Sequence, residues 1–327
     1  MTELNLVQAV NVALKRAMEE DSRVLVLGED VGINGGVFRA TEGLFERFGE
    51  RRVLDTPVAE ASIAGVSIGL AVQGFRPVAE IQFTGFAYAC IDQIINHASR
   101  LRSRTRGRLK CPMVLRAPAG GGIRAVEHHS ESPEAMFAHI PGITLVVPSS
   151  PARAYGLLLS AVRDPDPVVF LEPTRLYRAA REDVSDDGAG LPLGRCFMLR
   201  SGRDLTIVAW GAMISEALAA ADQLATENIE VEVIDVATLK PLDSATILAS
   251  VARTGRLVIV HEAPMTCGYG AEIVARVCGG DVITSLLAPI ERVTGYDTMM
   301  PYLRTEAFYM PNVPRIMAAV RRSMAYA

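Results

Sequence analysis

The sequence lacks several features that would point to a particular environment or partner. Its five cysteines include no C-x-x-C pair, which argues against a zinc site and for a reducing compartment. The formal net charge is -4 at pH 7, without the basic excess that phosphate contacts demand. The longest weakly polar run, residues 61–75, is too short and too rich in glycine and serine to span a bilayer. We therefore expect no nucleic-acid or membrane partner, and ligands that are small molecules or proteins.

The common nucleotide-binding signatures are also missing. The segments GING at residues 32–35 and GGGI at residues 120–123 do not have the G-x-G-x-x-G order. The segment CGYGAEI follows an apolar run, but Ile273 stands where the third glycine would be. No G-x-x-x-x-G-K-[ST] sequence occurs, which excludes a P-loop. A dinucleotide site is therefore disfavoured.

The N-terminal segment, residues 1–22, predicts a helix rather than a targeting peptide. Apolar side chains recur at helical spacing, as at Leu6, Val10 and Ala17, and both charge signs lie on the other face. A signal peptide would need a continuous apolar core, and a transit peptide would lack these acids. We expect a cytoplasmic protein, or a protein of the mitochondrial matrix if its source has organelles.

Short apolar runs alternate with helical segments along the chain, which is typical of parallel α/β sheets. Two sets of runs occupy residues 23–31, 76–83, 111–118, 143–150 and 167–173, and then 204–211, 229–239, 256–263 and 281–289. Residues 86–101 and 151–163 have amphipathic helical spacing. A polar, glycine-containing stretch at residues 179–196 separates the sets and indicates a linker. The chain of 327 residues exceeds what one core usually supports, so we predict two doubly wound α/β domains.

Glu60 stands at the head of a run of small and apolar residues, ASIAGV, and has two interpretations. Pro57 suits the first turn of a helix, so the carboxylate could simply be favoured by the helix dipole. The small residues that follow predict close packing, however, and a carboxylate in such a place would need a partner. The residues alone leave both interpretations open.

A second candidate lies after the run at residues 111–118, in a loop with the sequence EHHSES. Ligands of such sheets bind at the carboxyl ends of the strands. A loop histidine is most often an incidental surface residue, whereas His128 and His129 with Glu127 and Glu131 could form a metal or acid/base site. A metal is disfavoured, because adjacent residues rarely bind one ion together.

Six basic residues occupy every second position from 100 to 110. The simplest interpretation is a solvated loop, and the sharper alternative is a docking edge for an acidic partner. The sequence does not decide between the two.

Six segments together carry a resemblance to one family. They are GEDVGINGGVFRATEGL at residues 28–44, DTPVAEASIAG at 55–65, RPVAEIQF at 76–83, HHSESPEAMFAHIPG at 128–142, PSSPARAYGLLLSAVRDPDPVVFLEP at 148–173 and RVTGYDT at 292–298. Over nearly its whole length the chain resembles the beta subunit of the thiamine-dependent decarboxylating component of 2-oxo acid dehydrogenase complexes. The resemblance implies a pyrimidine-binding domain at residues 1–185, a linker at 186–199 and a transketolase-type C-terminal domain at 200–327.

The resemblance also implies roles for single residues. In this family the glutamate of T-P-x-x-E, here Glu60, hydrogen-bonds the aminopyrimidine ring of thiamine diphosphate and holds the tautomer that activates the cofactor. Val58 would pack on the cofactor and Phe86 would stack on the pyrimidine, with ordinary core packing as the alternative for Phe86. His129 matches the histidine of H-S-x-S, which is proposed to assist proton transfer as the acyl group passes to lipoamide. His128 does not match that position.

A possible structural site for a monovalent cation is implied more weakly. The segments CPMVL and AVRDPD resemble a loop that binds potassium in some members, largely through backbone carbonyls. On that match the ligands would come from Ala161, Asp164 and Asp166. This chain has Pro165 within the loop, and a solvated turn is the alternative.

One expected signature of a thiamine enzyme is absent. Such enzymes generally hold magnesium and the diphosphate with a GDG motif followed by an NN pair, and no GDG occurs here. The resemblance therefore implies a half-site, completed by an alpha subunit in an α2β2 assembly that shares thiamine diphosphate and magnesium. The implied reaction is oxidative decarboxylation of a 2-oxo acid with reductive acylation of lipoyl groups on a transacylase core, which the C-terminal domain would dock.

Two other functions stay open on the sequence. Acetoin cleavage uses a closely related beta subunit, and an orphan chain could keep this fold for docking alone. The presence of Glu60, Phe86 and His129 argues against a pure scaffold, which would not need them. Pyruvate and branched-chain 2-oxo acids both remain candidate substrates.

Overall fold

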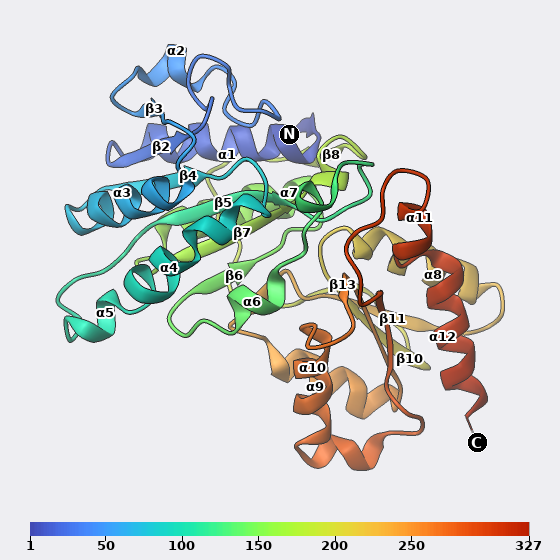
Figure 1. The fold of residues 1–327 in the computed structure, drawn as a ribbon. Helices are drawn as coiled ribbons and strands as arrows, with labels where there is room; N and C mark the ends of the chain where they lie inside the picture. The colour runs from blue at the N-terminus through green and yellow to red at the C-terminus, as the bar shows by residue number, and fades with distance from the viewer. Residues whose placement is uncertain (327) are drawn as a thin grey trace.

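Two largely parallel sheets organise the chain, and helices cover both faces of each (Figure 1). The structure is a computed structural model that describes residues 1–326. The larger sheet has seven strands in the order β12-β6-β7-β5-β4-β2-β3. Their bounds are β2 Val24–Gly28, β3 Val53–Asp55, β4 Arg76–Glu80, β5 Val114–Ala119, β6 Thr144–Val146, β7 Val168–Pro173 and β12 Thr238–Lys240. All neighbours are parallel except β12, which runs antiparallel to β6.

The faces of this sheet bury alternate residues of each strand. In β2, Val24 and Val26 pack with helices α1 (Leu6–Glu20) and α7 (Pro151–Arg163). Leu25 and Leu27 point to the other face, which is covered by α3 (Glu60–Val72), the irregular helical segment 86–98 and α6 (Glu134–Ala138). Strands buried on both faces explain why the sequence shows continuous apolar runs here.

The smaller sheet has five strands in the order β14-β13-β10-β11-β9. Its strands are β9 Phe197–Arg200, β10 Leu205–Ala209, β11 Val231–Asp235, β13 Leu257–Pro264 and β14 Glu291–Gly295. Helices α8 (Met213–Ala225) and α12 (Val313–Ala325) cover one face, while α9 (Ser244–Thr254) and α10 (Gly270–Cys278) cover the other. The remaining elements include β1 Thr2–Leu4 paired with β8 Glu182–Val184, α2 Leu44–Phe48, α5 Leu101–Arg104 and α11 Glu306–Tyr309. Two doubly wound α/β units are therefore confirmed.

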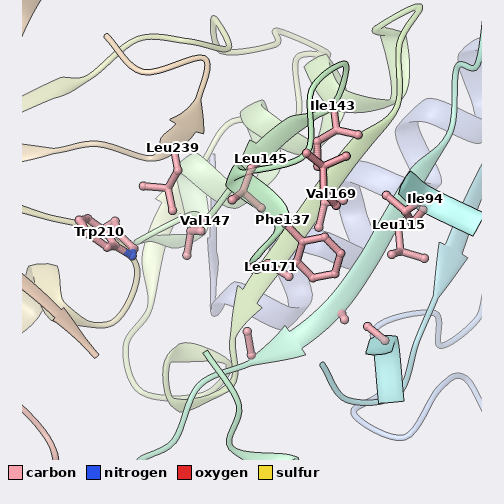
Figure 2. Close-up of a cluster of buried hydrophobic side chains, with 14 of the residues drawn as sticks. Ile94, Leu115, Phe137, Ile143, Leu145, Val147, Val169, Leu171, Trp210 and Leu239 are labelled. Carbon is pink, nitrogen blue, oxygen red and sulfur yellow. The ribbon is translucent and has the colours of Figure 1, made fainter. Parts of the chain in front are cut away.

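The two sheets are joined by a shared apolar core. β12 belongs to the C-terminal part of the sequence but pairs with β6, so Thr238 lies opposite Val146 in the larger sheet. Figure 2 shows Trp210 and Leu239 beside Val147 and Leu145, in the same buried cluster as Phe137. The interface between the two sheets is therefore packed like a hydrophobic core and is not a loose contact between domains.

Several predicted elements match the structure and others do not. The predicted helices at the N-terminus and at 151–163 are confirmed, the latter with Ser150 accepting the Arg153 N–H and Pro151 in the first turn. The strand predicted at 281–289 is wrong, because residues 281–285 form a 3₁₀ turn over α9 and the edge of the sheet is taken by β14. The segment predicted as a helix at 86–101 is helical but irregular, passing from 3₁₀ at 86–90 to π geometry at 94–98. Within residues 1–326, no helix combines the length and apolarity needed to cross a membrane.

Candidate cofactor site

The candidate residues follow neighbouring strands at one edge of the seven-stranded sheet. Glu29 comes directly after β2, and Glu60 follows β3 after a short extended segment. Phe86 follows β4, and His129 lies in the loop after β5. These strands are adjacent in the order β5-β4-β2-β3, and their carboxyl ends meet at the same edge. The sheet therefore gathers residues that are up to a hundred positions apart in the chain at the usual binding edge of such folds.

Glu60 is the first residue of α3. The helix starts after Ala59, whose backbone (φ -155°, ψ 71°) is not helical, so the prediction that Pro57 lies in the first turn is wrong. The backbone carbonyl of Glu60 accepts the thiol hydrogen of Cys90 at 3.1 Å, which ties the start of α3 to the segment that begins at Phe86. Glu60 is half-buried, and the exposed Val58 stands beside it at 80% exposure.

Helix α3 buries only one of its apolar faces. Ile63, Ala64 and Ile68 pack into the core, whereas Ala61 and Val66 are exposed. The close packing predicted around Glu60 is thus present on the sheet side alone. A carboxylate at a helix N-terminus is also favoured by the helix dipole, so both interpretations of Glu60 have a structural basis.

Glu29 is a candidate that the sequence reasoning missed. Its side chain is 6% exposed, and its Oε1 atom is buried without a hydrogen-bond partner. Burial, followed by the nearby charges of Glu60 and Asp30, raises the pKa of the Glu29 carboxyl group. The signal that could have found it is its position directly after the apolar run at 23–28.

His129 lies in an aromatic cluster. Its ring is 4.0 Å from the ring of Phe83 and 5.4 Å from that of Phe86 between centroids, in edge-to-face orientations. The adjacent His128 is exposed, with its Nδ1 3.4 Å from Glu127, and its ring centroid lies 4.6 Å from that of His129 and 5.6 Å from that of Phe86. Both histidine rings therefore lie near Phe86, and His129 also contacts Phe83.

The environment of His129 favours its neutral form. Burial lowers the pKa of its imidazole, the proximity of His128 lowers it further, and Glu127 acts in the opposite direction. The Nδ1 atom is buried and has no protein hydrogen-bond partner. A neutral imidazole with an unpaired nitrogen can accept or deliver a proton at neutral pH.

The histidine loop packs tightly on the segment after β4. A Cβ atom at Gly85 would lie 2.0 Å from the backbone oxygen of His128, so no side chain fits at that position. The carboxylate of Glu131 accepts a hydrogen bond from the Tyr88 hydroxyl at 2.9 Å, and its carbonyl accepts one from Thr84 at 3.0 Å. Glu131 is thus engaged in fixing the loop.

A buried ionic network lies within the strands below the site. The Arg116 guanidinium pairs with the carboxylates of Glu172 (2.6 Å) and Glu80, and all three side chains are at most 2% exposed. The Tyr177 hydroxyl donates to Glu172 at 2.5 Å. One guanidinium group thus pairs with two carboxylates. Burial raises the pKa of Glu80, although the positive charge of Arg116 acts in the opposite direction.

The candidate cation loop is already engaged by arginines. Arg76 donates to the backbone carbonyls of Val162 (2.8 Å) and Asp164 (3.2 Å). Arg102, from the basic segment 100–110, pairs with Asp166 at 2.6 Å. The carbonyl of Ala161 accepts the Asp164 N–H at 3.3 Å. These guanidinium groups supply positive charge to oxygen atoms that a potassium ion would otherwise neutralise.

Among residues 1–326, no group of three or more histidine, cysteine, aspartate or glutamate side chains is arranged to hold a metal ion. The residues that follow the strands fit the pyrimidine half of a thiamine cofactor better than its metal-bound half. They offer a carboxyl group at Glu60, an aromatic ring at Phe86 and an unpaired imidazole nitrogen at His129.

Comparisons with known proteins define the class of this fold and site. The transketolase pyrimidine-binding domain matches residues 2–180, and the transketolase C-terminal domain matches residues 194–316. A solved structure described as "Split gene transketolase, inactive beta4 tetramer" superposes with a TM-score of 0.82 over 99% of both chains; at 24% identity this shows the fold. The chain is thus a two-domain protein of the transketolase type, as predicted.

More similar relatives narrow the family. The pyruvate dehydrogenase E1 component subunit beta of Acholeplasma laidlawii is 45% identical over 322 residues, covering 98% of each chain. The protein of the same name from Bacillus subtilis (strain 168) is 45% identical over 326 residues, covering 100% of each chain. The chain belongs to this family of 2-oxo acid dehydrogenase beta subunits, which confirms the resemblance carried by its motifs.

Proposed function

We propose that this chain is the beta subunit of a pyruvate dehydrogenase first component, which decarboxylates pyruvate and transfers the acyl group to lipoyl groups of a transacylase core. The observation that carries the proposal is the convergence of Glu60, Phe86 and His129 at one sheet edge. The names of the relatives favour pyruvate over branched-chain 2-oxo acids as the substrate.

Thiamine diphosphate, when bound, supplies the nucleophilic carbon and the electron sink for decarboxylation. Glu60 would hold the aminopyrimidine ring by a hydrogen bond from its carboxyl group, with Val58 and Phe86 packing on the ring. Glu29 is buried beside Glu60, and its own pKa is raised by burial and then by the charge of Glu60, so the two carboxyl groups interact directly. His129, in its neutral form, would exchange a proton with the lipoyl sulfur as the acyl group is transferred.

A separate alpha subunit completes the site in this proposal. It would bring the magnesium and diphosphate half, for which residues 1–326 offer no cluster of ligands. The exposed apolar surface of Val58 and Val66 beside Glu60 is consistent with a partner chain at this edge. We propose an α2β2 assembly in the cytoplasm, with domain boundaries at residues 185 and 200 and a linker between them.

The cation loop at Ala161, Asp164 and Asp166 remains a weaker proposal. Potassium binding there would require Arg76 or Arg102 to release its present partners. A dependence of stability on potassium, measured against sodium and choline chloride at equal ionic strength, tests it.

Calorimetric titration tests the half-site directly. Magnesium and thiamine diphosphate are titrated into this chain alone and then into its mixture with the alpha-type partner. Tight binding in the mixture only is the expected result, and tight binding by this chain alone contradicts the shared site. A substrate panel with pyruvate, branched-chain 2-oxo acids and acetoin then decides the substrate.

A further inference from the structure

The loop that carries His129 is held from the C-terminal half of the chain. It connects β5 to α6, and both Gly120 and Gly122 have left-handed backbone, with φ of +82°. Alternation of left-handed and right-handed residues turns successive backbone N–H groups toward one side, which forms anion-binding concavities in many proteins. In this loop the anions are carboxylates of the same chain.

Two buried glutamates accept these N–H groups. Gly121 donates its N–H to Glu262 of β13. Gly122 donates to Oε1 of Glu306 in α11 at 2.7 Å, and Arg124 donates to Oε2 of the same residue at 3.0 Å. Glu262 is 7% exposed and Glu306 is 4% exposed. They lie 141 and 184 residues away from their glycine partners in the sequence, so only the docking of the two halves brings them together.

Further contacts bracket His129 on both sides. Two residues before it, the carboxylate of Glu127 accepts a hydrogen bond from the Tyr302 hydroxyl at 2.5 Å. Three residues after it, the Ser132 hydroxyl donates to Glu262 at 3.3 Å. The loop is therefore fixed at its start, beside the histidine and at its end.

The glycines allow this close approach. A Cβ atom at Gly120 would lie 2.9 Å from Oε1 of Glu262, and the left-handed backbone would strain any other residue there. A Cβ atom at Gly121 would lie 2.5 Å from the end of the Met300 side chain. The GGG sequence, which does not match a nucleotide-binding motif, is thus explained by the contact between loop and C-terminal half.

We infer that Glu262 and Glu306 are positioning residues, which hold the backbone at 121–124 so that His129 faces Phe86. The inference rests on the proposed role of His129 in acyl transfer. Neither glutamate needs to touch the cofactor or substrate. The C-terminal half thereby contributes to the site by binding the backbone of the loop, in addition to packing against the larger sheet.

Amide hydrogen exchange of the full chain tests whether the two glutamates restrain the loop, and it needs no measurement of enzymatic activity. Glu262→Ala and Glu306→Ala are each expected to speed exchange of amides 121–130 about tenfold, the effect of losing one or two hydrogen bonds. Trypsin cleavage after the exposed Arg124 should accelerate in parallel. Amides of β2 should not change, and Glu227→Ala, which removes an exposed carboxylate paired with Arg321, is the matched control.

Conservative variants distinguish the loss of hydrogen bonds from the loss of side-chain volume. Glu262 uses only Oε1 for Gly121 and Ser132, so Glu262→Gln can keep both bonds, and its loop amides should exchange at the rate of the unmodified chain. Glu306 accepts the Gly122 N–H through Oε1 and the Arg124 N–H through Oε2 at 3.0 Å and, more weakly, Oε1 at 3.3 Å, so Glu306→Gln loses the shorter Arg124 bond and should loosen the Arg124 amide most. If an alanine variant unfolds throughout, the Glu306→Gln result decides, and an unchanged Arg124 amide overturns the inference.

The complex with the alpha-type partner then gives the functional readout. Misplacement of a reacting group by about 1 Å can cost about 10²-fold in rate, so the alanine variants should lose lipoyl acylation on this scale. Decarboxylation with an artificial electron acceptor should fall much less. The inference is overturned if amide exchange in the loop becomes faster while the ratio of lipoyl acylation to decarboxylation stays constant. Absence of both activities from the unmodified complex would instead refute the proposed function and leave the exchange result standing.

Discussion

The carboxyl edge of the seven-stranded sheet has an open end and a covered end. At the open end, Glu29 and Glu60 lie close together beside the exposed Val58, and Glu29 has an oxygen without a partner. At the covered end, Glu134 accepts the Trp210 N–H at 3.2 Å and Glu262 accepts the Gly121 N–H. Burial is the first cause of the raised pKa at Glu29, Glu134 and Glu262 alike.

The difference lies in what the chain itself supplies to these acids. The covered end receives donors from the loop after β5 and from the C-terminal half, although one oxygen of Glu134 has no partner. Among residues 1–326, the Glu29 side chain at the open end accepts no hydrogen bond, so this carboxyl group remains available to a ligand. A buried acid that receives no donor is thus a better indicator of function here than a buried acid alone.

The sharpest test of the open end is Glu60→Gln. Loss of the hydrogen bond from this carboxyl group to the aminopyrimidine ring should lower decarboxylation by about 10²–10⁴-fold, the usual contribution of a positioned acid or base. The free energy of unfolding in urea should fall by about 1 kcal/mol or less, the usual contribution of an acid at a helix N-terminus, and assembly with the alpha-type partner should be kept. Normal turnover by the variant, with exposed Glu50→Gln as control, would remove Glu60 from the site.

Arg116→Met disrupts the buried ionic network that lies below both ends of the sheet edge. It leaves Glu80 and Glu172 buried without their cation, so unfolding free energy should fall by about 3–5 kcal/mol. The exposed pair of Arg102 with Asp166 is the control, and Arg102→Met should cost about 1 kcal/mol or less. Equal urea midpoints for the two variants would show that burial does not distinguish these ion pairs.

His129→Ala tests the boundary between the two ends. Lipoyl acylation should fall by about 10²-fold or more, while decarboxylation measured with an artificial acceptor should change less. His139→Ala is the matched control, because this histidine is exposed at the end of α6. An equal loss of both activities in His129→Ala would contradict its role in acyl transfer.

Glu262→Gln gives the smallest effect and concerns the covered end. Burial raises the pKa of Glu262 to about 7, so between about pH 4.5 and 7 the folded chain keeps a proton that the unfolded chain has released. This residue therefore favours folding at low pH, and its contribution is lost as pH rises to 7. The unmodified chain should lose on the order of 1–3 kcal/mol relative to the variant between pH 5 and pH 8. Parallel urea titrations at the two pH values measure the difference.

Local patterns in the sequence were sufficient for much of the fold. The amphipathic spacing of α1 and the Ser150-Pro151 start of α7 predict helices that the structure confirms, because both depend on neighbours within a few residues. The motifs around Glu60 and His129 likewise identified the family, while the roles of these residues remain predictions.

Contacts between distant parts of the chain could not be predicted in this way. No local pattern shows that Glu262 and Glu306 reach the loop at 121–124, or that residues 238–240 pair with β6. The strand predicted at 281–289 failed for the same reason, since residues 281–285 form a 3₁₀ turn against α9 and the later strand β14 completes the sheet. Glu29 was overlooked because its isolation from donors exists only in three dimensions.

The position of β12 has a further consequence for the independence of the two halves. β12 covers the outer edge of β6 and so closes one border of the larger sheet. A fragment that stops before residue 238 would expose unpaired backbone groups along β6, which is the kind of edge on which chains aggregate or exchange strands. A chimera built from two family members would therefore need to take residues 238–240 from the same parent as β6, even though the sequence places them in the other half.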